Sequence, residues 1–143
     1  TALFRKAADR LITFGGLKVA VLGLTFKPGT DDLREAPSLD NVELLLAQGA
    51  NIYAYDPVGI ENFKKKYPEG KIGRGSITYV KRADEALRAA NICFIFTEWQ
   101  DIKDITPDTY KKLMKPALVY DGRNIHSLQS MKDAGVEYYS IGR

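Results

Sequence analysis

Short apolar runs alternate with segments of helical periodicity from residue 18 to the end of the chain, and this alternation most restricts the possible folds. Expected strands cover 18–22, 52–55, 92–96, 117–120 and 137–139, and expected helices cover 38–48, 60–67, 84–90, 107–114 and 128–134. Residues 68–79, which contain three glycines, are expected to form a loop. Strands that are apolar on both faces need cover on both sides. The sequence therefore predicts an α/β fold, with a doubly wound parallel sheet in three α/β/α layers.

An amphipathic helix is expected before the first strand. Apolar side chains over residues 2–13 recur at helical spacing, and Gly15 and Gly16 end the segment. The chain begins at Thr1 rather than at a methionine, so we expect a piece of a longer protein. With 143 residues the chain is long enough for one domain that buries roughly 70% of its extended surface.

Composition excludes several classes of function. The net charge of +3 is mild, and the run Lys64–Lys66 is expected to be a solvated helix face, so nucleic acid is not an expected partner. One cysteine and one histidine exclude a disulfide framework and a multi-Cys or multi-His metal site. No apolar stretch reaches 18 residues and no signal peptide opens the chain. We therefore expect no membrane partner and a cytoplasmic location.

The loop after the first strand, residues 23–37, is the strongest candidate site. In doubly wound sheets, ligands bind beyond the carboxyl ends of the strands, at the switch in strand order. Thr25 and Pro28 stand where a dinucleotide fingerprint needs glycines, so this is not an ordinary NAD site. Lys27 beside Phe26 suits a phosphorylated ring ligand. The alternative is a purely structural loop whose charged residues pair among themselves.

Three further segments follow strands at the same edge. Arg123, after Gly122, could bind phosphate or sugar hydroxyls, or could pair with Asp121 in a surface turn. Trp99 is expected in core packing or a subunit contact, and Asp56 as a helix cap or turn residue rather than a ribose-binding acid.

The lone cysteine and the lone histidine are not expected to be catalytic. Cys93 lies inside the run ICFIF and is expected to be a buried structural thiol, and His126 a polar residue at a helix start. These considerations lead as far as an α/β domain that binds an anionic ligand.

Five motifs in order resemble a known family. The stretch VAVLGLTFKPGTDDLREAPS at 19–38 is followed by YDP at 55–57, FTEW at 96–99, DGRN at 121–124 and YYSIGR at 138–143. Together they resemble the C-terminal nucleotide-sugar (UDP) binding domain of the UDP-glucose/GDP-mannose dehydrogenase family. The resemblance covers residues 17–143 and implies a Rossmann-like domain there. It makes 1–16 the end of a helix from a central region.

The resemblance implies an oxidoreductase of polysaccharide biosynthesis, an NAD-dependent 6-dehydrogenase that converts UDP-glucose to UDP-glucuronate. Such an enzyme has an N-terminal NAD-binding domain and a helical dimerisation region, uses two NAD and a catalytic cysteine, and is expected to form a homo-oligomer. The cysteine precedes this region, so the chain alone is expected to hold no catalytic residue and to be inactive.

The resemblance also implies residue roles. Phe26, Lys27 and Arg123 would bind the UDP-sugar substrate, and Arg34 would reach NAD bound mainly by the N-terminal domain. Thr30, Asp31 and Asp32 would shape the loop between them.

Two alternatives stay open. One is the same domain in a 6-dehydrogenase of GDP-mannose or of a UDP-N-acetylhexosamine. The other is a non-catalytic nucleotide-binding or assembly module.

Overall fold

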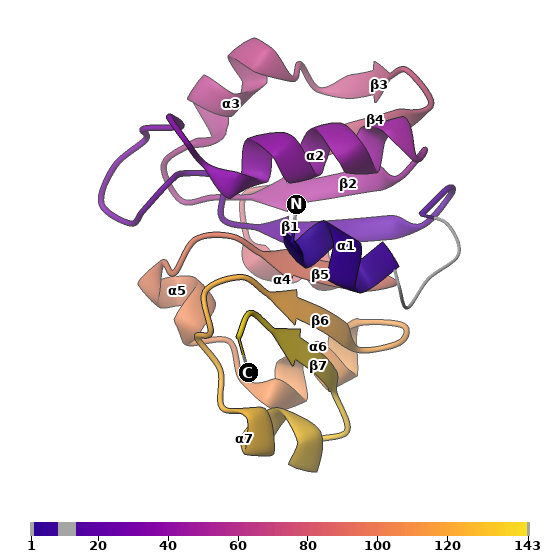
Figure 1. The fold of residues 1–143 in the computed structure, drawn as a ribbon, viewed down its shortest axis with the longest axis vertical. Helices are drawn as coiled ribbons and strands as arrows, with labels where there is room; N and C mark the ends of the chain where they lie inside the picture. The colour runs from indigo at the N-terminus through magenta and orange to yellow at the C-terminus, as the bar shows by residue number, and fades with distance from the viewer. Residues whose placement is uncertain (1, 9–13, 143) are drawn as a thin grey trace.

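The computed structural model describes residues 2–8 and 14–142, which form a seven-stranded sheet with helices on both faces (Figure 1). Its strands are β1 (Lys18–Leu22), β2 (Asn51–Tyr55), β3 (Gly70–Ile72), β4 (Gly75–Tyr79), β5 (Ile92–Ile95), β6 (Leu118–Asp121) and β7 (Glu137–Ser140). Its helices are α1 (Ala2–Ala8), α2 (Pro37–Ala47), α3 (Ile60–Lys66), α4 (Ala83–Leu87), α5 (Gln100–Lys103), α6 (Pro107–Leu113) and α7 (Leu128–Asp133).

The strand order is β3-β4-β2-β1-β5-β6-β7, and every neighbouring pair is parallel except β3 with β4. The order reverses at β1, because β2 lies on one side of it and β5 on the other. This is the switch point at which a doubly wound sheet binds its ligands. The predicted fold class is confirmed.

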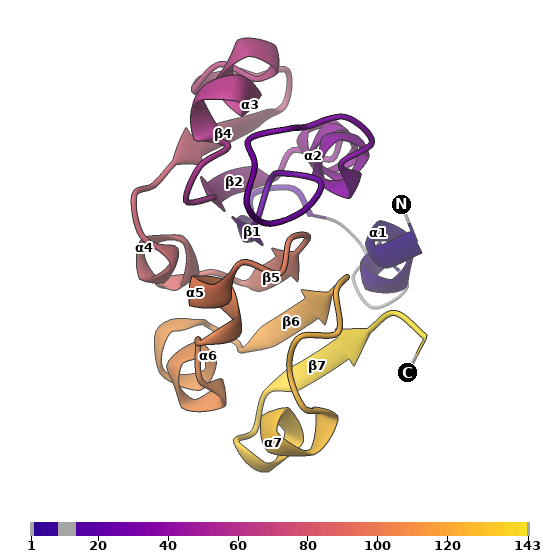
Figure 2. The ribbon, with the colours of Figure 1, turned by 90° about the vertical axis from the view of Figure 1, so that its left-hand side faces the viewer.

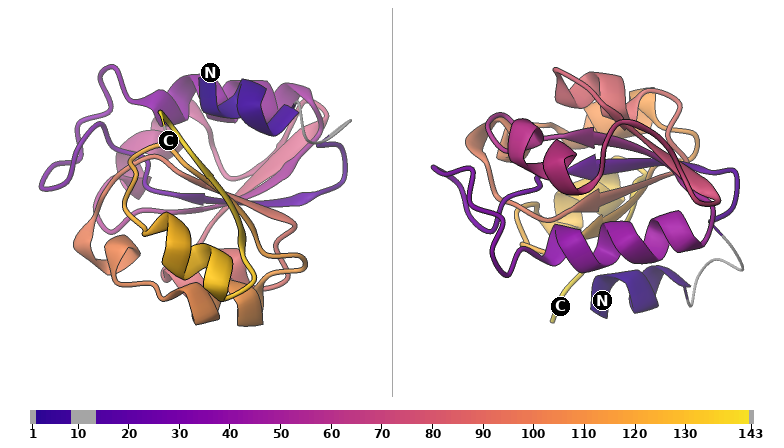
Figure 3. Two further views of the ribbon diagram at one scale, coloured as in Figure 1. Left: turned by 60° about the horizontal axis from the view of Figure 1, so that its bottom comes forward. Right: turned by 90° about the horizontal axis from the view of Figure 1, so that it is seen from above.

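Two apolar cores lie on opposite faces of the sheet, because successive side chains of a strand point to opposite sides. Val19 and Val21 pack with α1, α2 and α3 on one face, whereas Ala20 and Leu22 pack with α4, α5, α6 and α7 on the other. Figure 3 shows the two helical layers with the sheet between them. Each core is closed by helices, so the ends of the strands are the places left for a ligand.

The expected loop over 68–79 is wrong, because this segment forms the hairpin of β3 and β4. Two of its glycines allow the hairpin to form. Gly73, at φ +60°, starts the two-residue turn. At Gly75 a Cβ atom would lie 2.6 Å from the carbonyl oxygen of Ala50, so only glycine allows β4 to approach β2 this closely. Helix α5, over Gln100–Lys103, was likewise not predicted.

Helix α1 packs against the sheet rather than standing apart from it. Ala7 is buried, and the Lys6 ammonium donates a hydrogen bond of 2.6 Å to the carbonyl oxygen of Ser140. The helix was expected over 2–13, but residues 9–13 lie outside the described part of the chain. The domain boundary between residues 16 and 17 stays a prediction.

Candidate functional site

Four segments singled out in the sequence meet at one edge of the sheet. They follow β1, β2, β5 and β6, which are adjacent and parallel in the order β2-β1-β5-β6, so their carboxyl ends lie side by side. The loop after β1 projects at the left of Figure 1 and lies near the centre of Figure 2, which looks onto this edge. The candidate site is this loop, residues 23–36, together with the turn around Arg123.

The loop begins at a rigid root, defined here as Leu24 and Thr25. Both residues are fully buried, and their backbone groups are bonded to buried side chains from other segments. The Asp56 carboxylate accepts from the N–H of Leu24 at 2.7 Å and of Thr25 at 3.3 Å. The Ser38 and Thr97 hydroxyls donate to the carbonyl oxygens of Leu24 and Thr25, both at 2.6 Å. Buried backbone polar groups need such partners, so this root has a single favoured conformation.

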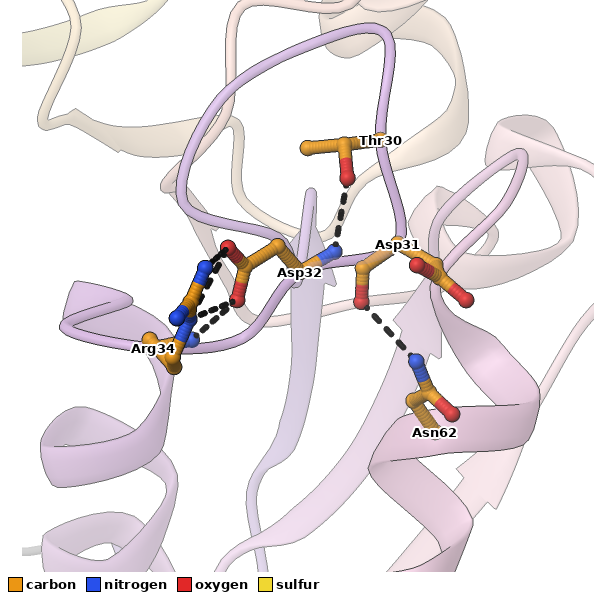
Figure 4. Close-up of polar contacts among 5 residues, drawn as sticks. All are labelled: Thr30, Asp31, Asp32, Arg34 and Asn62. Carbon is orange, nitrogen blue, oxygen red and sulfur yellow. Dashed lines mark hydrogen bonds and ion pairs between the residues drawn. The ribbon is translucent and has the colours of Figure 1, made fainter.

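Beyond the root, polar side chains fold the loop onto itself (Figure 4). The Phe26 N–H donates to the Asp32 carbonyl oxygen at 3.0 Å, and the Thr30 hydroxyl accepts from the Asp32 N–H at 3.1 Å. The Asn62 amide of α3 donates to the Asp31 carbonyl oxygen at 3.1 Å. The alternative of internal pairing is therefore present, although it leaves the side chains of Phe26 and Lys27 exposed.

Arg34 forms an ion pair within the loop. Its guanidinium lies on both oxygens of Asp32, with Nη2 2.8 Å from Oδ2 and Nε 3.1 Å from each oxygen. These hydrogen bonds lower the pKa of Asp32 to about 2. The Arg34 side chain is 88% exposed, so a ligand that approaches from outside can reach it.

Arg123 ties the loop to the strand ends on the other side of the switch point. Its Nε donates to the Phe96 carbonyl oxygen at 2.8 Å, and its Nη2 donates to the Phe26 carbonyl oxygen at 2.6 Å. The guanidinium carbon lies 5.9 Å from the centre of the Phe26 ring. Asp121 accepts from the Arg123 backbone N–H, not from its guanidinium, so the alternative of an Arg123–Asp121 side-chain pair is wrong.

A pocket of about 450 Å³ opens on this loop and is lined by Phe26, Lys27, Asp32, Arg34 and Glu35. Phe26, at 40% exposure, is one of the few large apolar side chains that reach solvent, and it offers a face on which a planar ring can stack. Lys27 beside it supplies a cation for phosphate. The arrangement suits a ligand that combines a ring with negative charge.

The first turn of this sheet lacks the features of an ordinary dinucleotide-binding site. A Cβ atom at Gly23 would lie 2.5 Å from the Thr97 Cβ atom, so the protein itself fills the space beside that glycine. The acid after β2, which bonds to ribose in dinucleotide-binding sheets, is Asp56 here. It is only 2% exposed and is bonded to N–H groups of its own chain. The turns after β1 and β2 are therefore not those of an ordinary dinucleotide-binding sheet.

The remaining residues singled out in the sequence have structural surroundings. The Trp99 indole is half-buried and donates to Asp56 at 3.0 Å, which supports the packing role. Cys93 is the expected buried thiol, and burial raises its pKa well above the usual value. His126 lies at a helix start as expected, directly before the helix cap Ser127, and it is buried beside Tyr110, 2.8 Å from its hydroxyl oxygen.

The structure adds residues that sequence reasoning missed. The expectation that Asp56 is a turn residue is confirmed, because it accepts from the N–H groups of Val58 at 2.9 Å and Gly59 at 2.6 Å. Its bonds to the loop root, and those of Ser38 and Thr97, were not predicted. The available signal was a polar residue just after a buried strand, at Asp56 and Thr97, and a serine in the first turn of α2.

Two other kinds of site find no support in the described residues. Residues 2–8 and 14–142 hold no group of three or more His, Cys, Asp or Glu side chains placed to bind a metal ion. In the same ranges, no helix has the length and apolar character that crossing a membrane requires.

Comparison with known proteins gives consistent matches. The sequence model for the UDP binding domain of the UDP-glucose/GDP-mannose dehydrogenase family matches residues 20–127. Over 141 residues the chain is 41% identical to UDP-glucose 6-dehydrogenase YwqF of Bacillus subtilis, covering 99% of this chain and 31% of that protein.

Two solved structures share the fold. A UDP-glucose dehydrogenase from Pyrobaculum islandicum matches 96% of this chain with a TM-score of 0.75 and 28% identity. An NDP-N-acetyl-D-galactosaminuronic acid dehydrogenase from Methanosarcina mazei matches 99% with a TM-score of 0.77 and 26% identity. This chain covers 28% of each of those structures. It therefore spans less than a third of the relatives it matches.

Proposed function

Because this chain belongs to the UDP-glucose/GDP-mannose dehydrogenase family and matches its UDP binding domain, we propose that it binds the nucleotide part of a UDP-sugar. The observation that carries the proposal is the meeting of Phe26, Lys27 and Arg123 at one sheet edge, with the Arg123 guanidinium bonded to the Phe26 carbonyl oxygen. An aromatic face, an ammonium and a guanidinium are complementary to a base, a phosphate and sugar hydroxyls.

Each of the three side chains has a distinct part in the proposed site. Phe26 stacks on the uracil ring, and Lys27 pairs with the diphosphate. Arg123 has two of its donor groups on backbone carbonyl oxygens, so it fixes the backbone of Phe26 and offers the rest of its guanidinium to phosphate or sugar.

The parent that we propose is an NAD-dependent UDP-glucose 6-dehydrogenase, which oxidises the C6 hydroxymethyl group to a carboxylate. The support is the identity of 41% to an enzyme of that name. The turn after β1 lacks the dinucleotide fingerprint, so in that parent the dinucleotide is bound mainly by another domain, with Arg34 as the contact from this side. Cys93 is buried and is not the nucleophile. A cytoplasmic location and a homo-oligomeric parent stay predictions.

A related sugar specificity is the second candidate. The Methanosarcina mazei neighbour is a dehydrogenase of an N-acetylgalactosamine-type sugar, and its fold superposes on this chain with a TM-score of 0.77. A purely structural assembly module is the third. Such a module would not require the exposed Phe26 ring or the charged side chains that line the pocket.

The test is calorimetric titration of the chain with UDP and, separately, with GDP. We expect saturable UDP binding, weakened by about 10-fold to 100-fold in Lys27→Ala and in Arg123→Ala, the usual effect of removing a charged contact. Lys65→Ala, on the exposed face of α3, and Arg74→Ala, on the β3–β4 turn, are the matched controls and should bind as the parent chain does.

The outcomes separate the candidates. Tighter binding of GDP would favour a GDP-mannose enzyme. If Lys27→Ala and Arg123→Ala bind UDP normally, the proposed site is wrong. The same preparation, supplied with UDP-glucose and NAD, is expected to form no NADH, and measurable NADH would contradict the absence of catalytic residues.

A further inference from the structure

We propose that Asp56 is a positioning residue that sets the Phe26–Lys27 segment opposite Arg123. The inference deepens the proposed function and rests on it for the identity of the ligand. Asp56 itself lines no part of the pocket on the loop, which is formed by Phe26, Lys27, Asp32, Arg34 and Glu35. It acts through the loop root, one residue before the binding segment.

The Asp56 carboxylate joins three segments of the chain. Oδ2 accepts from the N–H groups of Leu24 at 2.7 Å and Thr25 at 3.3 Å and from the Trp99 indole at 3.0 Å. Oδ1 accepts from the N–H groups of Val58 at 2.9 Å and Gly59 at 2.6 Å. The loop after β1, the turn after β2 and the segment after β5 therefore share one buried anion.

Further hydrogen bonds connect the loop root to the Phe26–Lys27 segment. The Thr25 hydroxyl has one proton, and its shorter contact is to the Lys27 carbonyl oxygen at 3.1 Å rather than to Asp56 at 3.4 Å. Phe26 is then bonded at both backbone groups, its N–H to Asp32 and its carbonyl oxygen to Arg123. A shift of the root would move Phe26 and Lys27 together, away from the guanidinium.

The segments around the root are closely packed. A Cβ atom at Gly59 would lie 2.6 Å from Thr25 Cγ2, and one at Gly23 would lie 2.5 Å from Thr97 Cβ. Both glycines flank the buried root, one in the β2–α3 turn and one at the end of β1. The root is thus held by hydrogen bonds and by contact with its neighbours, and Asp56 links the root to the turn that contains Gly59.

The acceptor geometry of Asp56 is what the root depends on. A carboxylate accepts hydrogen bonds at both oxygens, whereas an amide of the same shape accepts at only one and donates at the other. In Asp56→Asn, either orientation of the amide places its NH2 group against N–H donors, at the Leu24 side or at the Gly59 side. Buried donors would lose their partners, and the root would loosen without any change of volume.

The test measures the order of the loop without any ligand. In Asp56→Asn, amide hydrogen exchange at Leu24 and Phe26 should accelerate by about 10-fold or more relative to the amides of the central strands, since those two N–H groups depend on the root. Ile77→Val, in the core strand β4 and away from the loop, is the stability control. It should leave unchanged the ratio of the exchange rates at Leu24 and Phe26 to those in the central strands.

Trp99→Phe keeps an aromatic ring and removes only the indole donor, and it should increase the same ratio by a smaller factor. It carries the test if Asp56→Asn does not fold. A variant that exchanges uniformly faster everywhere, or not at all faster at the loop, overturns the inference.

UDP titration separates this inference from the proposed function. Asp56→Asn should weaken UDP binding by about 10-fold, and Ile77→Val should not. Normal UDP affinity in Asp56→Asn overturns the positioning role. If the parent chain itself binds no UDP, the proposed function fails, and the exchange ratio still decides whether Asp56 holds the loop.

Discussion

At the scale of single residues, the Asp32–Arg34 pair gives the loop a definite response to pH. The hydrogen bonds from Arg34 hold the Asp32 pKa at about 2, below its ordinary value of 3.8. A carboxylate with a lowered pKa contributes stability that is fully present above 3.8 and is lost as the pH falls toward about 2. The pair therefore survives through the range in which ordinary carboxylates become protonated.

We predict that Arg34→Ala raises the Asp32 pKa part of the way back toward 3.8. The rise is incomplete because the backbone N–H of residue 34, which also donates to Asp32 at 2.9 Å, is retained. The measurement is the pH dependence of the Asp32 carboxyl carbon shift by NMR, with Arg74→Ala as the control. An unchanged midpoint in Arg34→Ala would show that the ion pair is not formed in solution.

What the sequence could reveal about single residues depended on where their partners lie. Phe26, Lys27 and Arg123 were singled out because each follows a predicted strand, and the predicted sheet brings strand ends together. Asp56 has partners 32 and 43 positions away, at Leu24 and Trp99, and no spacing rule connects them. Its burial and its bonds became visible only in three dimensions.

At the scale of elements, the close approach of β1 to the segment after β5 shapes the edge that carries the site. Gly23, at φ +89°, ends β1, and a Cβ atom there would lie 2.5 Å from Thr97 Cβ and 2.6 Å from its backbone nitrogen. The loop residue Gly29 has nearly the same φ, +85°, but nothing lies within 4 Å of a Cβ atom placed on it. Comparing substitutions at these two glycines therefore separates the effect of backbone strain from the effect of steric contact.

We predict that Gly23→Ala lowers the free energy of unfolding by about 2–5 kcal/mol, and Gly29→Ala by about 1–2 kcal/mol. Both variants place alanine at a positive φ, but only Gly23→Ala also pushes two segments apart. Urea denaturation of the two variants and the parent chain measures the difference. Equal losses would contradict the contact between Gly23 and Thr97.

The helices and strands were predictable wherever their periodicity was uninterrupted. The five predicted strands and the five predicted helices after Gly16 are present, with ends that agree or differ by one residue, except for a difference of three residues at the end of α4. The β3–β4 hairpin was missed because its glycines indicate a loop when only composition is considered. Glycine is required at position 75 because a Cβ atom there would lie 2.6 Å from the Ala50 carbonyl oxygen, a tertiary contact that local sequence does not report.

At the scale of the whole molecule, Lys27 and Arg34 line the same pocket but are proposed to bind different ligands. Lys27 lies next to Phe26, whose carbonyl oxygen is held by Arg123, whereas Arg34 is 88% exposed and bonded to Asp32. In the proposed parent enzyme, Lys27 and Phe26 bind the nucleotide sugar, and Arg34 reaches NAD held by another domain. The loop would then join the two ligand sites.

We predict that Arg34→Ala in that parent enzyme raises the KM for NAD by about 10-fold and leaves the KM for the nucleotide sugar unchanged, since it removes one charged contact to the dinucleotide. Lys27→Ala should have the opposite pattern, and Arg74→Ala should change neither value. Steady-state kinetics with each substrate varied in turn provides the measurement. If Arg34→Ala instead raised only the KM for the nucleotide sugar, Arg34 would belong with Lys27 to a single substrate site. The loop would then bind one ligand rather than two.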